Sequence, residues 1–368
     1  MLYGWRLVGL AAILGLLGSA VAGMALAEVQ PGARVVEHPS PGGPSAGQSA
    51  RTAKGRQLLQ QAAAACDHTT YSGQQVVLWW GQGETSSSVV EVWHQSGGET
   101  LVQATGAAPA TPGNISRSPS ADNQDPDGIL GVSDRLLALL ESNYRVVYAG
   151  HGSADNRAAL VVEVRRPGGG LAARFWLDAA TKLPLRREIF ARDARMISED
   201  SFTSLQVGSS GLGAMPAPAA APWTAQLDGA RLTVLRAKGW PLPAQLPSNL
   251  VLFAATERSA SSGSVVDVSY SDGLNVVSLF VQRGSLARPV PGWRKITVDG
   301  HTVYSVNRDE RSFAWSANGF VYTMVADAPM TTVGQVVTTM PGAARAPGFW
   351  ERIGHGLHRL VSWLNPLR

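Results

Sequence analysis

The sequence predicts an α+β protein of two domains in which antiparallel strands predominate. Its 368 residues suffice for about two domains of ordinary size. Within residues 160–205, four short runs alternate apolar and charged residues, and turns rich in Gly, Pro and Asp separate them. Strands this close in sequence pair as antiparallel neighbours. The resulting sheet must bury its apolar face, either against another layer or by curling around a cavity.

The composition is that of an ordered protein and does not favour nucleic-acid binding. Apolar residues make up 45% of the chain and charged residues only 16%, so a sizeable core can form. The formal net charge of +4 is scattered, whereas binding to nucleic acid needs a dense basic face. Cys66 is the only cysteine, which excludes an internal disulfide. Such a residue is more often a small buried apolar group than a reactive thiol.

The first 27 residues predict an export signal. Arg6 precedes a long apolar run that ends in the small residues Ala25 and Ala27, and we expect cleavage after Ala27. The apolar run could also span a bilayer core of about 30 Å, so an uncleaved membrane anchor is the alternative. Residues 28–53 are rich in Pro, Gly and Ser without periodicity, which predicts a flexible tether.

Residues 54–207 are predicted to form the first domain. Good helix formers predict a helix over residues 54–66, and a serine-capped helix is expected at residues 134–142. Strands expected from alternation, in addition to the four of residues 160–205, lie at residues 74–80, 89–94, 101–104 and 144–149. Residues 107–128 are long and rich in Pro, Ser and Asp, which predicts a mobile loop.

Residues 208–222 read as a linker by composition, and residues 223–341 as a second, smaller α+β domain. A helix is expected at residues 331–339, packed on the sheet of that domain. The strands expected there lie at residues 250–256, 265–269, 275–282, 295–298, 301–307, 311–316 and 319–325. Residues 342–368 remain as a tail with helical periodicity.

Several segments of the chain resemble the MucB/RseB family of exported regulators of sigma-factor signalling, and they occur in the same order as in that family. In the first domain they are TyrSerGly at residues 71–73, TrpHis at residues 93–94 and WLDAATKLPLRREI at residues 176–189. In the second domain they are LPSNLVL, YSDGLNVVSLFVQ at residues 270–282 and VYTMVADAPMTTVGQVV. The resemblance covers roughly residues 54–340. The chain departs from it at Thr181 and Lys182, and at Asn156 and Arg157, where the family usually carries Gly in a turn.

The resemblance implies a half-open antiparallel β-barrel plugged by helices, similar to lipoprotein carriers of the LolA type, followed by a smaller α+β domain. It implies a non-enzymatic protein without a cofactor. The implied protein binds the extracytoplasmic part of a membrane-bound anti-sigma factor and senses a lipid-like ligand in the barrel. A carrier or scavenger of lipids or lipoproteins, using the same cavity, is the alternative.

A lipid cavity needs a concave apolar lining, and five side chains are candidates for it. They are Trp79, Trp80, Trp93, Phe175 and Leu177. Trp79 and Trp80 point to opposite faces of one strand, so only one of them can line the cavity. The alternative for each is that it fills the core.

In the second domain, Tyr270, Asp272 and Leu274 lie around a turn whose neighbouring strands could pair with a partner peptide. Asp272 and Gly273 are also ordinary turn residues, which is the alternative reading.

Metal binding and catalysis find little support in the sequence. Asn123, Asp125, Asp127 and Asp134 roughly follow a calcium-loop spacing, but an Asx turn before a capped helix explains them as well. His355 and His358 could share a metal, yet no third ligand is near them in sequence. No nucleophile-elbow signature occurs among the many serines. We therefore assign no metal site and no catalytic residue.

The tail is strongly amphipathic. Its apolar helical stripe contains Trp350, Ile353, Leu357, Leu360 and Leu364, while basic and polar residues occupy the rest of the surface. Such a helix either docks on the protein itself or lies on a membrane surface. In the second case it would make a peripheral membrane contact beside a membrane-bound partner.

Overall fold

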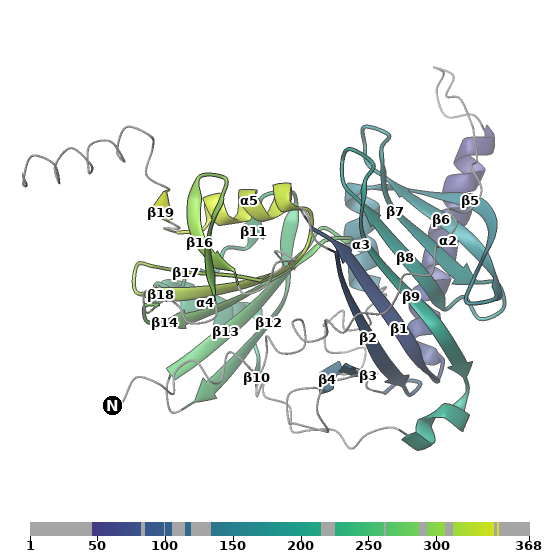
Figure 1. Cartoon of the computed structure of the whole chain (residues 1–368), viewed down its shortest axis with the longest axis horizontal. Helices are drawn as coiled ribbons and strands as arrows, with labels where there is room; N and C mark the ends of the chain where they lie inside the picture. The colour runs from purple at the N-terminus through teal and green to yellow at the C-terminus, as the bar shows by residue number, and fades with distance from the viewer. Residues whose placement is uncertain are drawn as a thin grey trace, which may run out of the picture.

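A computed structural model describes residues 46–81, 85–98, 100–104, 115–118, 134–214, 225–260, 263–286, 293–305, 312–341 and 344–345. Figure 1 shows two β-rich units side by side, with the first unit on the right. The expected signal (residues 1–27), most of the tether (28–53) and nearly all of the tail (342–368) lie outside the described residues. The five apolar stripe residues of the tail also lie outside the described residues. So do five of the residues considered for metal binding, namely Asn123, Asp125, Asp127, His355 and His358.

The first unit is one antiparallel sheet with two of its helices on one face. Its strands follow the order β4-β3-β2-β1-β9-β8-β7-β6-β5, and no pairing joins the two end strands. The strands are β1 (Tyr71–Trp80), β2 (Thr85–His94), β3 (Thr100–Ala104), β4 (Ile115–Ser118), β5 (Arg145–Ala154), β6 (Arg157–Arg165), β7 (Leu171–Asp178), β8 (Pro184–Phe190) and β9 (Met196–Val207). The helices are α2 (Ala46–His68), α3 (Asp134–Asn143) and the 3-10 helix η1 (Ser209–Ala214).

The second unit is also antiparallel, in the order β10-β12-β13-β14-β18-β17-β16-β15, with β11 on β12 and β19 on β16. The strands are β10 (Ala225–Gln226), β11 (Gln245–Leu246), β12 (Leu250–Ala260), β13 (Gly263–Ser271), β14 (Val276–Arg283), β15 (Arg294–Val298), β16 (His301–Ser305), β17 (Ser312–Ala317), β18 (Phe320–Asp327) and β19 (Ala344–Arg345). Helices α4 (Gly229–Ala237) and α5 (Met330–Thr339) pack on this sheet through its apolar core.

The predicted α+β class is confirmed, as a nine-stranded sheet left unclosed among the described strands plus a smaller α+β unit. Three segments contain regular structure that was not expected there. Helix α2 begins at Ala46, inside the expected tether, because residues 46–54 contain several good helix formers and no proline. Strand β4 lies inside the expected loop of residues 107–128, and η1 lies inside the expected linker.

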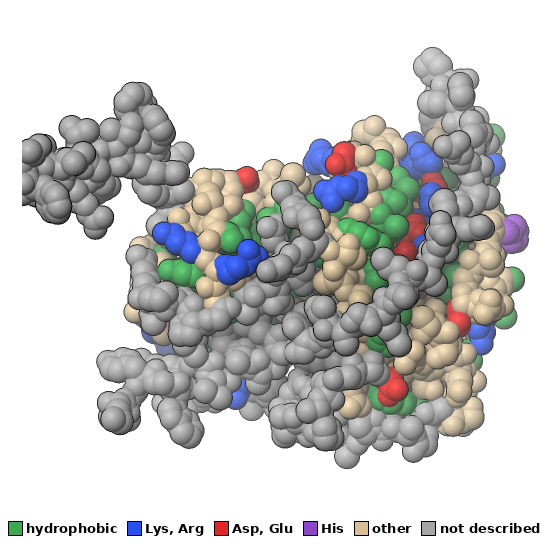
Figure 2. Space-filling model, in the orientation of Figure 1, with side chains coloured by type: hydrophobic (Ala, Val, Ile, Leu, Met, Phe, Trp, Pro, Cys, Tyr) green, Lys and Arg blue, Asp and Glu red, His purple; other side chains and the backbone are tan. Residues whose placement is uncertain are grey.

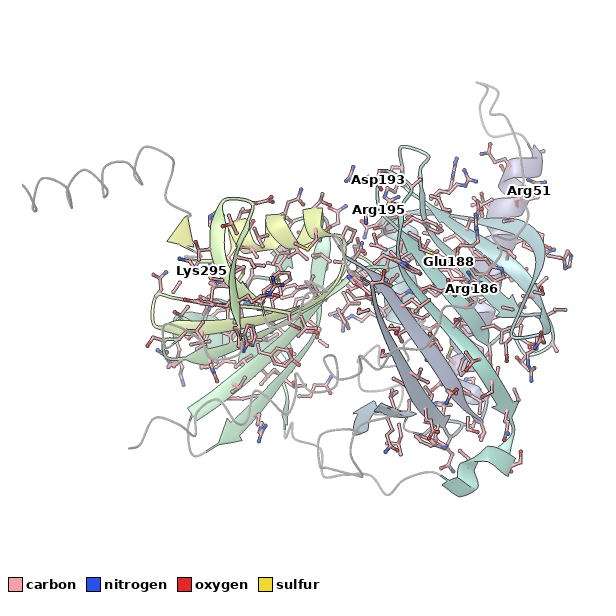
Figure 3. The ribbon with its side chains drawn as sticks, in the orientation of Figure 1. Arg51, Arg186, Glu188, Asp193, Arg195 and Lys295 are labelled. Atoms are coloured by element: carbon pink, nitrogen blue, oxygen red, sulfur yellow. The ribbon has the colours of Figure 1, made fainter. Side chains whose placement is uncertain are left out.

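The meander keeps the predicted alternation of apolar and charged faces. On its charged face, Glu163 pairs with Arg165 and Arg174, and Arg186 pairs with Glu188 and Glu199. Figure 3 places Arg186 beside Glu188, and Figure 2 shows charged side chains of both signs side by side on the first unit. Burial raises the pKa of the Glu188 carboxyl. The charges of this face thus neutralise one another, which leaves the opposite face to form the core.

The two turns that lack the family's usual Gly still adopt a left-handed backbone. Lys182 has φ 68° and Asn156 has φ 55°. The Asp178 carboxylate accepts the backbone N–H groups of Ala180 and Thr181, which stabilises the first of these turns without a glycine.

Helix α2 lies so close to β5 that a side chain at Gly55 has no room. A Cβ there would stand 2.8 Å from the Tyr148 backbone nitrogen. We therefore expect Gly55→Val to destabilise the first unit by about 1–3 kcal/mol through overpacking. Urea unfolding measures this, with Gln60→Val on the exposed face of the same helix as the control. Equal stability of the two variants would contradict this packing.

Candidate functional site

The face of the first sheet that carries α2 and α3 is apolar, and its side chains form two clusters. One contains Trp79, Phe175 and Leu177 together with residues of both helices. The other contains Tyr71, Val92 and Phe202. We call this surface the inner face. Burial raises the pKa of the Cys66 thiol, which packs against the second cluster, to about 12, so the residue is an uncharged filler there.

A band of polar side chains crosses the inner face between the two clusters. On β8, Leu185 belongs to one cluster, Ile189 to the other, and Arg187 stands between them. Asp200 on β9 lies directly opposite Arg187. Gln75 on β1 and Ser198 on β9 complete the band, and all four residues are less than a tenth exposed. A charged pair at this depth costs desolvation energy, so it must be held by further partners.

The second unit supplies those partners from the end of β18 and from the turn of residues 271–275, which lies between β13 and β14. Asp272 Oδ1 accepts the backbone N–H groups of Leu274 at 2.9 Å and of Asn275 at 2.8 Å. Gly273 adopts φ 97°, a conformation that favours glycine. The predicted turn chemistry is therefore present. We call this segment the docking turn, because it contacts the first unit.

The docking turn sits on the C-terminal end of α3. The Tyr144 hydroxyl donates to Asp272 Oδ2 at 2.7 Å, and Asn143 Nδ2 donates to the Asp272 carbonyl oxygen at 2.9 Å. Burial, together with the Asp272 carboxylate, raises the pKa of Tyr144, so the hydroxyl keeps its proton and remains a donor. A Cβ at Gly273 would stand 2.2 Å from the Leu140 backbone nitrogen. Glycine is thus required here both by the backbone conformation and by the neighbouring helix.

Leu274 and Arg187 extend this contact into the inner face. Leu274 is 5% exposed and belongs to the same apolar cluster as Trp79, Phe175 and Leu177. Arg187 Nη2 lies 3.0 Å from Asp327 Oδ2 at the end of β18 and 3.4 Å from the Leu274 carbonyl oxygen. Its Nε lies 3.8 Å from Asp200 Oδ2. One buried arginine therefore joins a carboxylate of each unit.

Comparison with known protein families found a match to the first unit. Residues 54–233 match the profile of the MucB/RseB N-terminal domain.

The first unit is therefore similar to the N-terminal domain of the MucB/RseB family.

Similar solved structures include MucB in complex with MucA(peri), with 20% sequence identity and a TM-score of 0.47 over 79% of this chain and 99% of that chain. The Pseudomonas aeruginosa MucA/MucB complex has 18% identity and a TM-score of 0.43 over 80% of this chain and 100% of that chain. The LolA superfamily protein NE2245 from Nitrosomonas europaea has 7% identity and a TM-score of 0.21 over 74% and 91%, respectively. A comparison with curated proteins found no match.

The MucB/RseB match spans α2 to α4, so it includes Tyr144 and Arg187 but ends before the docking turn. Of the five predicted ligand residues, Trp79, Phe175 and Leu177 lie together on the inner face, where they pack against the helices. Trp80 follows Trp79 directly and therefore lies on the opposite face. Trp93 pairs with Ser72 of β1 in a register without interruption, and Ser72 is seven residues from Trp79, so Ser72 and Trp93 also lie on that opposite face. Placing Trp93 with the inner group was therefore wrong.

The three predicted partner residues are all buried. Tyr270 is in the core of the second unit, where its hydroxyl donates to the Pro243 carbonyl oxygen at 2.8 Å. Asp272 and Leu274 are covered by the first unit. A partner cannot reach these side chains in this arrangement, so their role in partner binding stays a prediction that requires the units to part.

Sequence reasoning missed Asn143, Tyr144, Arg187 and Asp327. Arg187 had a usable signal, because it occupies an apolar position in the alternation Leu185, Arg187, Ile189. An arginine at such a position needs a buried partner. Within the described part of the chain, no group of three or more His, Cys, Asp or Glu side chains could hold a metal ion.

The buried imidazole of His94 predicts that the stability of the first unit depends on pH. Its ring stacks on Tyr71, Nε2 donates to the Asp67 carbonyl oxygen at 3.2 Å, and Nδ1 accepts from Thr100 Oγ1 at 2.9 Å. Burial lowers the pKa of His94, so the folded state favours the neutral ring. Its contribution to stability is complete above the unfolded pKa of about 6.5 and is lost as the pH falls toward the lowered pKa.

We therefore expect the wild type to lose more stability between pH 7.5 and pH 5 than His94→Gln does. Urea unfolding at the two pH values measures the difference between the proteins. Identical pH dependence would contradict this assignment of a neutral buried ring.

Proposed function

We propose that this chain is an exported regulator of sigma-factor signalling that binds the extracytoplasmic part of a membrane-bound anti-sigma factor. The family match over residues 54–233 carries the proposal, because the family is one of regulatory binding proteins. The expected export signal supports an extracytoplasmic location, and homologues of this family are periplasmic. Within the described residues, no helix combines the length and apolar character needed to cross a bilayer. The proposal assigns no catalytic residue and no cofactor.

A lipid-like ligand on the inner face is the second part of the proposal. The support is the pair of apolar clusters, which give Trp79, Phe175 and Leu177 a common surface. A carrier of lipids or lipoproteins would use the same surface. The second unit argues against a simple carrier, because carriage alone has no need of a unit docked at the inner face.

Capture from the native envelope tests the function. The tagged full-length chain would be expressed in its own host, crosslinked briefly, and purified, and both protein and lipid would be identified by mass spectrometry. We expect enrichment of an anti-sigma factor over an untagged control. Stoichiometric lipid without any anti-sigma factor would instead support the carrier.

The tail of residues 342–368 is proposed as a peripheral membrane contact, on the strength of its amphipathic stripe. Flotation with liposomes containing anionic lipid compares the full chain with a chain that ends at Pro341. Loss of flotation on truncation is expected, and equal flotation of the two chains would contradict this contact.

A further inference from the structure

The docking turn occupies the surface that the proposed ligand would need. Leu274 is the only side chain of the second unit, among the described residues, in the apolar cluster of Trp79, Phe175 and Leu177. The other apolar groups of that cluster come from the sheet, from α2 and α3, and from the segments next to them. Leu274 thus joins this cluster from the second unit and covers part of the inner face.

The contact that holds Leu274 there is polar around a small apolar centre. Asn143, Tyr144 and Arg187 supply the hydrogen bonds and the ion pair from the first unit, and Asp272 and Asp327 receive them in the second. Contacts between domains of one chain that are of this polar kind commonly open and close. Because each of these groups is hydrophilic, all of them can return to water when the units part, whereas the place of Leu274 would be left apolar.

We infer that Leu274 is a stopper for the inner face: an acyl chain that binds there takes the place of Leu274, and binding therefore undocks the second unit. The inference rests on the proposed function, whose ligand it makes a competitor of the docking turn. Undocking moves the second unit relative to the first.

The arithmetic of this coupling sets the expected effect. If the ligand binds only the undocked form, its apparent dissociation constant is the intrinsic one divided by the undocked fraction. With the undocked fraction at about a tenth, removing the stopper tightens binding by about tenfold. A ligand that binds elsewhere is not affected by the stopper.

The test uses the full exported chain and the fluorescent fatty acid 11-(dansylamino)undecanoic acid. Leu274→Ala vacates the place, and Gly273→Ala forces the turn off α3 through the clash with Leu140. Gly319→Ala is the matched control, because Gly319 has φ 77° and nothing within 4 Å of its Cβ position. We expect both docking-turn variants to bind the probe about tenfold more tightly than the wild type and Gly319→Ala. Equal affinity in all four proteins, or no binding to any, would overturn the inference.

A distance measurement gives a second, independent readout. Nitroxide labels at Ser153→Cys and Lys238→Cys, both exposed positions, report on docking in a Cys66→Ala background. Saturating probe is expected to lengthen or broaden the distance distribution of the otherwise wild-type chain. An unchanged distribution at saturation would overturn the inference, while capture of an anti-sigma factor in the separate experiment would leave the proposed function standing.

Discussion

Replacement of Arg187 by methionine is expected to lower the free energy of unfolding by about 3–5 kcal/mol, because it removes the positive charge that faces a buried carboxylate. Asp200 is 4% exposed and faces Arg187 across β8 and β9. Asp327 also pairs with Arg187, but its side chain is 29% exposed, so water can solvate its carboxylate when Arg187 is replaced. The larger part of the lost free energy of unfolding should therefore come from the broken interaction with Asp200. Chemical denaturation of the full chain measures the effect.

A double-mutant cycle separates this explanation from a general loss of packing. Asp200→Asn removes the negative charge that faces Arg187, so the double variant should recover part of the stability lost in Arg187→Met. Asp327→Asn is the matched comparison on the more exposed side. Strictly additive losses in Arg187→Met and Asp200→Asn would contradict a coupled buried pair.

Gly273→Ala should separate the unfolding of the two units. The substitution places a Cβ 2.2 Å from the Leu140 backbone nitrogen and puts a non-glycine residue at φ 97°. Overpacking of this kind costs about 1–3 kcal/mol, and the left-handed backbone adds roughly 1–2 kcal/mol. Because undocking relieves the clash with Leu140, we expect calorimetry to resolve two transitions in the variant where the wild type shows coupled unfolding.

The variant Gly319→Ala is the control for the cost of a left-handed backbone without a steric clash. Gly319 joins β17 to β18 at φ 77° with open space around its Cβ position, so its alanine variant carries strain without a clash. It should lose stability yet keep the coupled transition. Two transitions in Gly319→Ala, or a single one in Gly273→Ala, would contradict the role given to the docking turn.

Much of the fold could be predicted from local patterns. Alternation placed most of the strands, and the charged side chains of Glu163, Arg174 and Arg186 do share the solvent-facing side of the meander. The start of α2 was missed because the Pro- and Gly-rich composition of residues 28–53 as a whole hid the helix formers at its end. Helix α4 was missed because it is short and follows a Pro- and Ala-rich stretch.

The candidate site was less predictable, because its contacts join residues far apart in sequence. Asp272 showed the pattern of a turn residue and is one, but Tyr144, which binds its carboxylate, lies 128 residues away. Alternation could say that Trp79 and Trp80 point to opposite faces. It could not give the register in which β1 and β2 pair, and Trp93 was misplaced for that reason.

The measurement that tests the central claim most directly is a calorimetric titration of the full exported chain with the purified extracytoplasmic region of each anti-sigma factor encoded in the same genome. The cytoplasmic region of each factor is the control. We predict that one extracytoplasmic region binds with one-to-one stoichiometry and a dissociation constant of about 1 μM or tighter. If none of these regions binds at concentrations of about 100 μM, the chain is not the regulator proposed here.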